Sequence, residues 1–169
     1  MPELTLVVYG LPAPQGSKRY LGHSAKGAIR MAESSKHVKP WRDDVRTAAL
    51  TAIGYGSPGG LAGGFPLDGP LVVRMVFTFT RPKSHYRTGR NAHLLRDGAP
   101  ARPASLPDLS KLLRSTEDAL TSAGVWTDDA RLVEYQRAAK VYVGADPEAL
   151  DAPGARITIR TLTVQEGPQ

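Results

Sequence analysis

The chain has 169 residues, no cysteine, and 22 Lys and Arg against 16 Asp and Glu, which gives a formal net charge of +6. This length suits one domain with a core of its own, and the lack of cysteine excludes disulfide bonds and thiolate metal sites. The excess of cations favours a polyanionic partner. The first residues do not resemble a signal peptide and no apolar stretch approaches membrane-spanning length, so we expect a cytoplasmic protein without a membrane partner.

The N-terminal part predicts a strand, a turn and a helix. In LTLVVYG (residues 4–10) every second side chain is apolar, which is typical of a strand. The turn LPAPQGSKR follows and is expected to present Lys18 and Arg19 outside regular structure. IRMAES, from residue 29, is compatible with a short strand. A helix is predicted from Pro40, because proline fits a first helical turn and apolar residues then recur at helical spacing.

The middle of the chain consists of two loops and one strong strand. Residues 54–70 hold seven Gly and three Pro, which predicts a flexible connector. LVVRMVFTFT (71–80) alternates large apolar residues and predicts a strand at the core. Residues 81–107 have no clean period and are too long for an ordinary connection, so they form either a functional or a mobile loop. The functional reading is favoured by the loop's six cations, which are Arg81, Lys83, Arg87, Arg90, Arg96 and Arg102.

The C-terminal part predicts a second helix and two more strands. The helix begins after Asp108, a suitable N-cap, and ends at Gly124. Its apolar stripe consists of Leu109, Leu112, Leu113, Thr116, Ala119, Leu120 and Ala123. Residues 132–143 and 156–164 read as strands. The whole chain therefore predicts an α+β domain over 1–169, with a mixed or antiparallel sheet of four to five strands packed against two main helices.

Three acids stand at the two ends of the second predicted helix. Asp108 precedes it, and Asp128 and Asp129 follow it. Taken alone, this pattern also fits a helix cap and a turn. If the acids converge, their natural ligand is a hard divalent cation such as Mg²⁺, which stabilises charge when water attacks a phosphodiester. Their convergence depends on tertiary packing.

A longer pattern surrounds these acids. DLSKLLRSTEDALTSAGVWTDDARLVEY resembles the core of the RusA-type Holliday-junction resolvases, whose pattern is D-L-D-N-L-x-K, then D-A-L, a glycine, an aromatic or aliphatic pair and D-D before a strand. PAPQGSKR and SKHVKPWRDDV resemble the N-terminal turn and first helix of phage and prophage members. The likeness covers most of the chain and leaves residues 54–70 and 81–107 as variable, flexible insertions.

The resemblance implies a homodimeric endonuclease that depends on Mg²⁺, with Mn²⁺ a possible substitute, and nicks four-way DNA junctions in recombination and repair. Asp108 and Asp129 match two of the family's three catalytic acids, with Asp128 beside them as a further metal ligand. Lys111 or Arg114 would stabilise charge during catalysis. The resemblance also favours DNA contact by Lys18, Arg19 and the six cations of residues 81–102.

The sequence departs from the family pattern at two positions of this site. Ser110 stands where the second acid is expected, and Arg114 stands where the lysine is expected. Serine is a poorer Mg²⁺ ligand than a carboxylate unless Asp128 or Glu117 compensates. Arginine can hold a phosphate but cannot readily transfer a proton. The alternative is therefore a branched-DNA-binding protein with weak or lost cleavage.

Some other residues have plainer interpretations. Arg114 and Asp118 have the i,i+4 spacing of a surface ion pair. Trp41 and Trp126 are expected to anchor the core or a dimer. The four histidines show no metal-ligand spacing and are expected at the surface.

Overall fold

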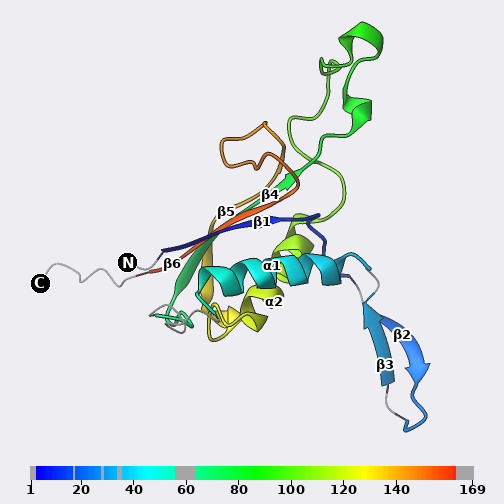
Figure 1. The fold of residues 1–169 in the computed structure, drawn as a ribbon. Coiled ribbons are helices and arrows are strands. Elements are labelled where there is room, and N and C mark those ends of the chain that lie inside the picture. Colours follow the sequence, from blue (N-terminus) through cyan, green and yellow to red (C-terminus); the bar gives the residue numbers. More distant parts are fainter. Residues whose placement is uncertain (1–2, 17, 28, 34–35, 56–63, 163–169) are drawn as a thin grey trace, which may run out of the picture.

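The fold, a computed structural model, is described over residues 3–16, 18–27, 29–33, 36–55 and 64–162 (Figure 1). Its main sheet has four strands in the order β1-β6-β4-β5. These are β1 (Glu3–Tyr9), β4 (Leu71–Phe79), β5 (Leu132–Tyr142) and β6 (Gly154–Thr161). β6 pairs antiparallel with both β1 and β4, whereas β5 pairs parallel with β4. The predicted mixed sheet is confirmed.

Two helices, α1 (Val38–Ala52) and α2 (Leu109–Ser122), pack against each other and cover one face of this sheet (Figure 1). A separate two-stranded hairpin, β2 (Lys18–His23) with β3 (Ile29–Glu33), extends away from the helices. The α+β class and the two main helices are therefore confirmed. In the part of the chain that the structure describes, no helix is long and apolar enough to cross a membrane.

The core lies between the helices and the sheet. Alternate residues of β1 are buried, as the sequence pattern predicts. Trp41 of α1 is fully buried and donates a hydrogen bond from Nε1 to Thr116 Oγ1 of α2 at 3.1 Å. Trp126 is also buried in this cluster, and its Nε1 donates to Thr121 Oγ1 at 2.7 Å. Both tryptophans thus anchor the core, as expected of aromatics with a satisfied polar atom.

The ends of α2 lie where the sequence places them, although one buried residue was missed. Asp108 precedes the helix with an extended backbone, and Gly124 follows it with φ of +73°, a conformation that favours glycine. Ser115 lies on the buried face, because its hydroxyl donates to the Ala13 carbonyl oxygen at 2.6 Å. Leu109 and Leu113 of the predicted stripe are only partly buried.

The three predicted loop regions differ in outcome. Lys18 and Arg19 do not lie on an irregular turn but in β2, opposite β3, because the prolines and glycine that prevent pairing end before them. Residues 56–63 of the predicted connector lie outside the described residues, while Leu67, after them, is buried beside Trp126. Residues 81–107, here called the arm, contain two short 3₁₀ turns and rise away from the sheet (Figure 1). The flexibility of both segments stays a prediction.

Candidate functional site

Helix α2 separates the two predicted catalytic acids within one chain. Asp108 precedes α2, and Asp129 begins the short turn η3 (Asp129–Arg131) that follows the helix. The 14 residues of α2 span about 21 Å at the usual helical rise. Because β5 starts directly after η3 and runs parallel to β4, Asp129 lies near the start of these strands, whereas Asp108 shares a groove with Phe79 at the end of β4.

No complete metal site forms in the described part of one chain. Among those residues there is no group of three or more His, Cys, Asp or Glu side chains that could hold a metal ion. Asp108, Asp128 and Asp129 are all exposed. The predicted convergence of the acids at one point is therefore not achieved by a single subunit.

Asp108 is an exposed acid with one cationic neighbour. Its carboxylate lies 3.3 Å from Lys111 Nζ, one helical turn further along α2. Both side chains are about half exposed, at 48% and 54%, so water screens this ion pair and it contributes little to stability. Asp108 makes no side-chain capping hydrogen bond to α2. Its carboxylate is thus accessible to a further ligand.

Asp129 lies in a different environment, close to Glu117 and Tyr135. Tyr135 of β5 donates a hydrogen bond from its hydroxyl to the Glu117 carboxylate of α2. Burial raises the pKa of Glu117, the Tyr135 hydrogen bond lowers it, and the negative charge of Asp129 raises it. Burial and the bond to Glu117 in turn raise the pKa of Tyr135. The carboxylates of Glu117 and Asp129 are therefore close enough to interact electrostatically.

Glu117 is the acid that the structure adds to the predicted site. From the sequence alone, Glu117 is expected only to compensate for the family's second acid, which is replaced by Ser110. Ser110 itself is exposed in the first turn of α2, whereas Glu117 interacts electrostatically with Asp129. Its partner Tyr135 has no sequence signal of its own, because it reaches Glu117 only through the packing of β5 against α2.

The remaining predicted site residues have distinct roles. Asp128 Oδ1 accepts a hydrogen bond from the Ala130 main-chain nitrogen at 2.7 Å, which makes it a turn-forming residue. Arg114 is exposed, and its positive charge lowers the pKa of Glu117. The expected Arg114–Asp118 pair is not seen, because Asp118 pairs with Arg42 of α1 instead. Arg114 thus lies near the middle of α2, one helical turn before Glu117.

Two cations at the base of the arm attach it to the sheet. Arg81 stacks on the ring of Tyr142, with its guanidinium carbon 4.1 Å from the ring centroid. Arg102 forms an ion pair of 3.0 Å with Asp146, whose side chain is only 5% exposed. Hydrogen bonds from the Arg137 side chain and from the Glu148 main-chain nitrogen lower the pKa of Asp146 to about 2. His85, expected at the surface, packs edge-on against Tyr142.

The other arm cations divide into two kinds. Arg87 pairs with Asp97 at 3.0 Å, and Arg96 Nε donates to a main-chain carbonyl oxygen of the arm at 2.7 Å. These two therefore help to hold the arm's shape. The side chains of Lys83 and Arg90 are exposed and make no hydrogen bond or ion pair with any described residue. Their charges are the most available to an external anion.

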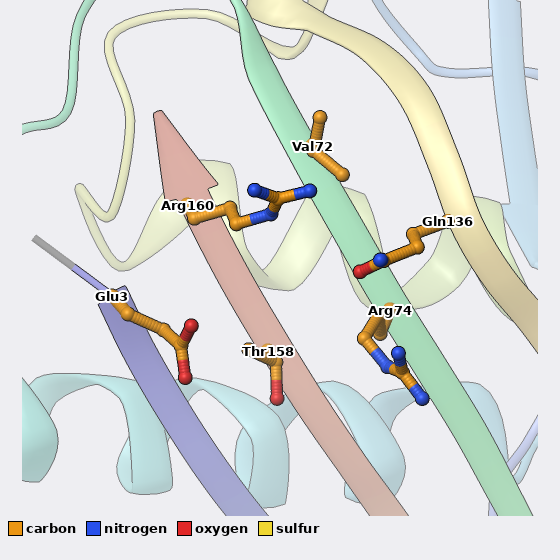
Figure 2. A pocket seen from close by; sticks show the side chains of 6 residues that line it. All are labelled: Glu3, Val72, Arg74, Gln136, Thr158 and Arg160. Carbon is orange, nitrogen blue, oxygen red and sulfur yellow. The ribbon is translucent and has the colours of Figure 1, made fainter. Parts of the chain in front are cut away.

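The sheet face opposite the helices carries a polar hollow of about 400 Å³ (Figure 2). Arg160 extends from β6 across β4, and Gln136 of β5 extends toward the same strand. Arg74 also lines the hollow but forms an ion pair of 2.8 Å with Glu148, and Glu3 lies at its other side. The charges of this hollow are therefore largely balanced, unlike those of the arm.

Comparison with known proteins identifies the family. No curated protein matches the chain. The model of a family described as "Endodeoxyribonuclease RusA" matches residues 12–160, a span that includes Asp108, Glu117, Asp129 and the whole arm. Because this match extends over most of the chain and agrees with the D…DD pattern on either side of α2, the protein belongs to the RusA endodeoxyribonuclease family.

Proposed function

We propose that this protein is a structure-specific endodeoxyribonuclease that resolves Holliday junctions and related branched DNA in recombination and repair. The family match over residues 12–160 carries this proposal, because the matched span contains acids at two of the three expected catalytic positions. Both of these acids, Asp108 and Asp129, are exposed and thus accessible to DNA.

The active form is proposed to be a homodimer whose sites combine residues of two copies. Carboxylates are the donors that Mg²⁺ or Mn²⁺ prefers, so the chemistry of the acids fits the divalent ion on which resolvases of this family generally depend. Their number does not suffice within the described part of one chain, where Asp129 interacts with Glu117 but no group of three such ligands forms. A second copy that brings its Asp108 to this pair would complete the set.

A surface suited to this pairing lies next to Asp129. β5 is an edge strand of the sheet, with backbone hydrogen-bonding groups along one side left for another chain. It also presents Val133 and Tyr135, which are 59% and 43% exposed. Exposed apolar side chains on an open edge support association with another protein surface. Two such composite sites would also suit the cutting of two strands of one junction.

The chain's own residues suggest how the site would hold its substrate. A bound divalent ion would supply charge neutralisation at the phosphodiester and lower the pKa of the attacking water. Arg114 is placed beside Glu117 and would stabilise negative charge on the phosphate. On the arm, Lys83 and Arg90 would contact the backbone of a duplex branch. Lys18 and Arg19 on the β2–β3 hairpin are proposed to contribute to the same attraction.

A second candidate function is branched-DNA binding with weak or lost cleavage. The observation that favours it is the exposed Ser110, which supplies no charge where the family pattern has an acid. Arg114 in place of lysine removes a group that transfers protons readily. The arm cations would bind DNA equally well in either case.

One experiment separates the two functions. A synthetic four-way junction labelled on each strand is incubated with the protein in EDTA, Mg²⁺ or Mn²⁺, with linear duplex as the control. The nuclease proposal predicts paired nicks in the junction that require the metal, and an intact duplex. A junction that is retarded in a gel but stays uncut with either ion would favour the binding protein.

A further inference from the structure

An apolar groove of about 650 Å³ lies beside Asp108, at the end of the molecule where α1 and α2 begin. Its walls come from the segment after β1, from Phe79 at the end of β4, and from the residues just before α2. Leu11 and Leu106 on these walls are 59% and 82% exposed. Large apolar side chains left in water along a hollow of this volume are typical of a ligand-binding groove.

The groove is held in shape by hydrogen bonds to its walls. Ser115 of α2 donates from its hydroxyl to the Ala13 carbonyl oxygen at 2.6 Å, and the Lys111 carbonyl oxygen accepts from a main-chain nitrogen of the same wall at 2.9 Å. On the other wall, Lys140 Nζ donates to the Pro107 carbonyl oxygen at 2.8 Å. These contacts fix both sides before any ligand arrives, which lowers the entropy cost of binding.

The polar groups of the groove are gathered where α1 and α2 begin. Asp108 and Lys111 lie at the start of α2, and His37 precedes α1. Lys111 is paired with Asp108 at 3.3 Å, but both side chains are about half exposed, so the ammonium group can still reach an anion, which the partial positive charge of two helix N-termini also favours. An apolar hollow with a phosphate-binding edge is complementary to a nucleotide, in which a flat ring is attached to a phosphate.

In DNA, the base that can enter such a groove is an unpaired one. A base inside a duplex is stacked and paired, and removing it costs a few kcal/mol, whereas a base at a branch point or mismatch has already lost part of these interactions. We infer that the groove accepts an unpaired base from the branch point of the DNA and thereby positions the adjoining phosphate at Asp108 and Lys111. This inference rests on the proposed function and extends it, because it explains how branched DNA is distinguished from linear duplex.

The test uses junctions that carry the fluorescent base 2-aminopurine at one branch-point position at a time, or in the middle of an arm of the junction. Binding of the full-length protein should raise the fluorescence several-fold at a branch-point position and leave the mid-arm base unchanged. The double substitution Leu11→Ser/Leu106→Ser should remove the increase and weaken junction binding by about fivefold to tenfold. Its affinity for linear duplex should stay the same.

The matched control is Tyr55→Ser, which removes another large exposed side chain, 67% exposed, beyond the opposite end of α1. This variant should keep both the fluorescence increase and the junction affinity. Because Leu11, Leu106 and Tyr55 are all exposed, these substitutions should leave folding intact, as thermal unfolding would verify.

Several results would overturn the inference. If wild-type protein prefers and cuts the junction but the fluorescence does not rise at any branch-point position, the inference is wrong. The proposed function would still stand in that case. If light scattering shows that the double substitution converts a dimer into a monomer, the groove binds a second copy of the chain and not a DNA base. Wild-type protein with no preference for junction over duplex would instead defeat the proposed function together with the inference.

Discussion

The two ends of α2 present their acids in different ways. At the first end, Asp108 is exposed beside Lys111 and an apolar groove. At the other end, Asp129 lies near Glu117, whose carboxylate is bonded to Tyr135. We infer that the first end recognises a nucleotide, and the second end has two interacting carboxylates, which are donors that a hard cation prefers. Under the proposed function, one subunit therefore carries two partial sites, and catalysis would require their union.

The largest expected effect is the loss of cleavage when either acid becomes neutral. Asp108→Asn and Asp129→Asn should each lower nicking of a four-way junction by roughly 100-fold or more, since losing a ligand costs more than losing an outer-shell partner. Junction affinity should survive, because removing negative charge does not weaken attraction to phosphate. Nicking and gel retardation are measured on the same preparations. Equal loss of binding and nicking in either variant would point to damaged folding instead.

A smaller effect should follow from restoring the family's missing acid. Ser110→Asp places a carboxylate two residues from Asp108, on an exposed position of α2. Nicking at limiting Mg²⁺ should rise about tenfold, because an added carboxylate strengthens a site for a hard cation. Thr47→Asp, on an exposed position of α1, is the control for an added charge. Nicking that does not respond to Ser110→Asp would place residue 110 outside the site.

The arm should influence affinity more than chemistry. Lys83→Gln and Arg90→Gln remove the two exposed arm cations that have no partner among the described residues. Each should weaken junction binding a few-fold and reduce the slope of log affinity against log salt concentration by about 1. Arg46→Gln, an exposed cation on α1, serves as the control. An unchanged salt dependence in both arm variants would remove the arm from the DNA interface.

The smallest expected effect concerns the stability of the Asp129 end. Burial raises the pKa of Glu117 in the folded state, so the folded protein holds the proton of this group more tightly than the unfolded chain does. The stability that this provides is complete below the unfolded pKa of Glu117. It is lost as the pH rises through the folded pKa. Glu117→Gln keeps an acceptor for Tyr135 and removes the charge. It should raise the free energy of unfolding at pH 7 by up to about 1 kcal/mol.

Urea unfolding from pH 4 to pH 8 measures this change. Wild type should lose stability relative to Glu117→Gln as the pH increases. Nicking should fall in the same variant if Glu117 supplies the carboxylate that Ser110 lacks. A variant that is less stable than wild type at pH 7 would contradict the stated environment of Glu117.

Local sequence patterns predict most of the fold, but they do not predict which residues of the candidate site meet in space. The alternation in β1, the proline near the start of α1 and Gly124 after α2 each act within a few residues, so they can be read directly. The meeting of Glu117 with Tyr135 spans 18 residues and depends on how β5 packs against α2. The wall of the groove likewise depends on Ser115 and Ala13, which are 102 residues apart. Such contacts follow from tertiary packing and have no local signature.

The separation of Asp108 from Asp129 has the same origin. The sequence shows both acids at the ends of one helix, but the parallel pairing of β5 with β4 decides that Asp129 stays at the far end. The family resemblance predicts that Asp108 and Asp129 are catalytic, but it does not predict the distance between them in one chain. Under the proposed function a second subunit unites them, and its position cannot be predicted from a local pattern in the sequence.

The most direct test of this union is a mixed dimer of Asp108→Asn and Asp129→Asn subunits, isolated with two different affinity tags. If each site combines Asp108 of one copy with Asp129 of the other, the mixed dimer contains one intact site, and it should nick one strand of a junction while both parent homodimers stay inactive. A mixed dimer as inactive as its parents would show that each site lies within a single chain, contrary to the composite site proposed for this protein.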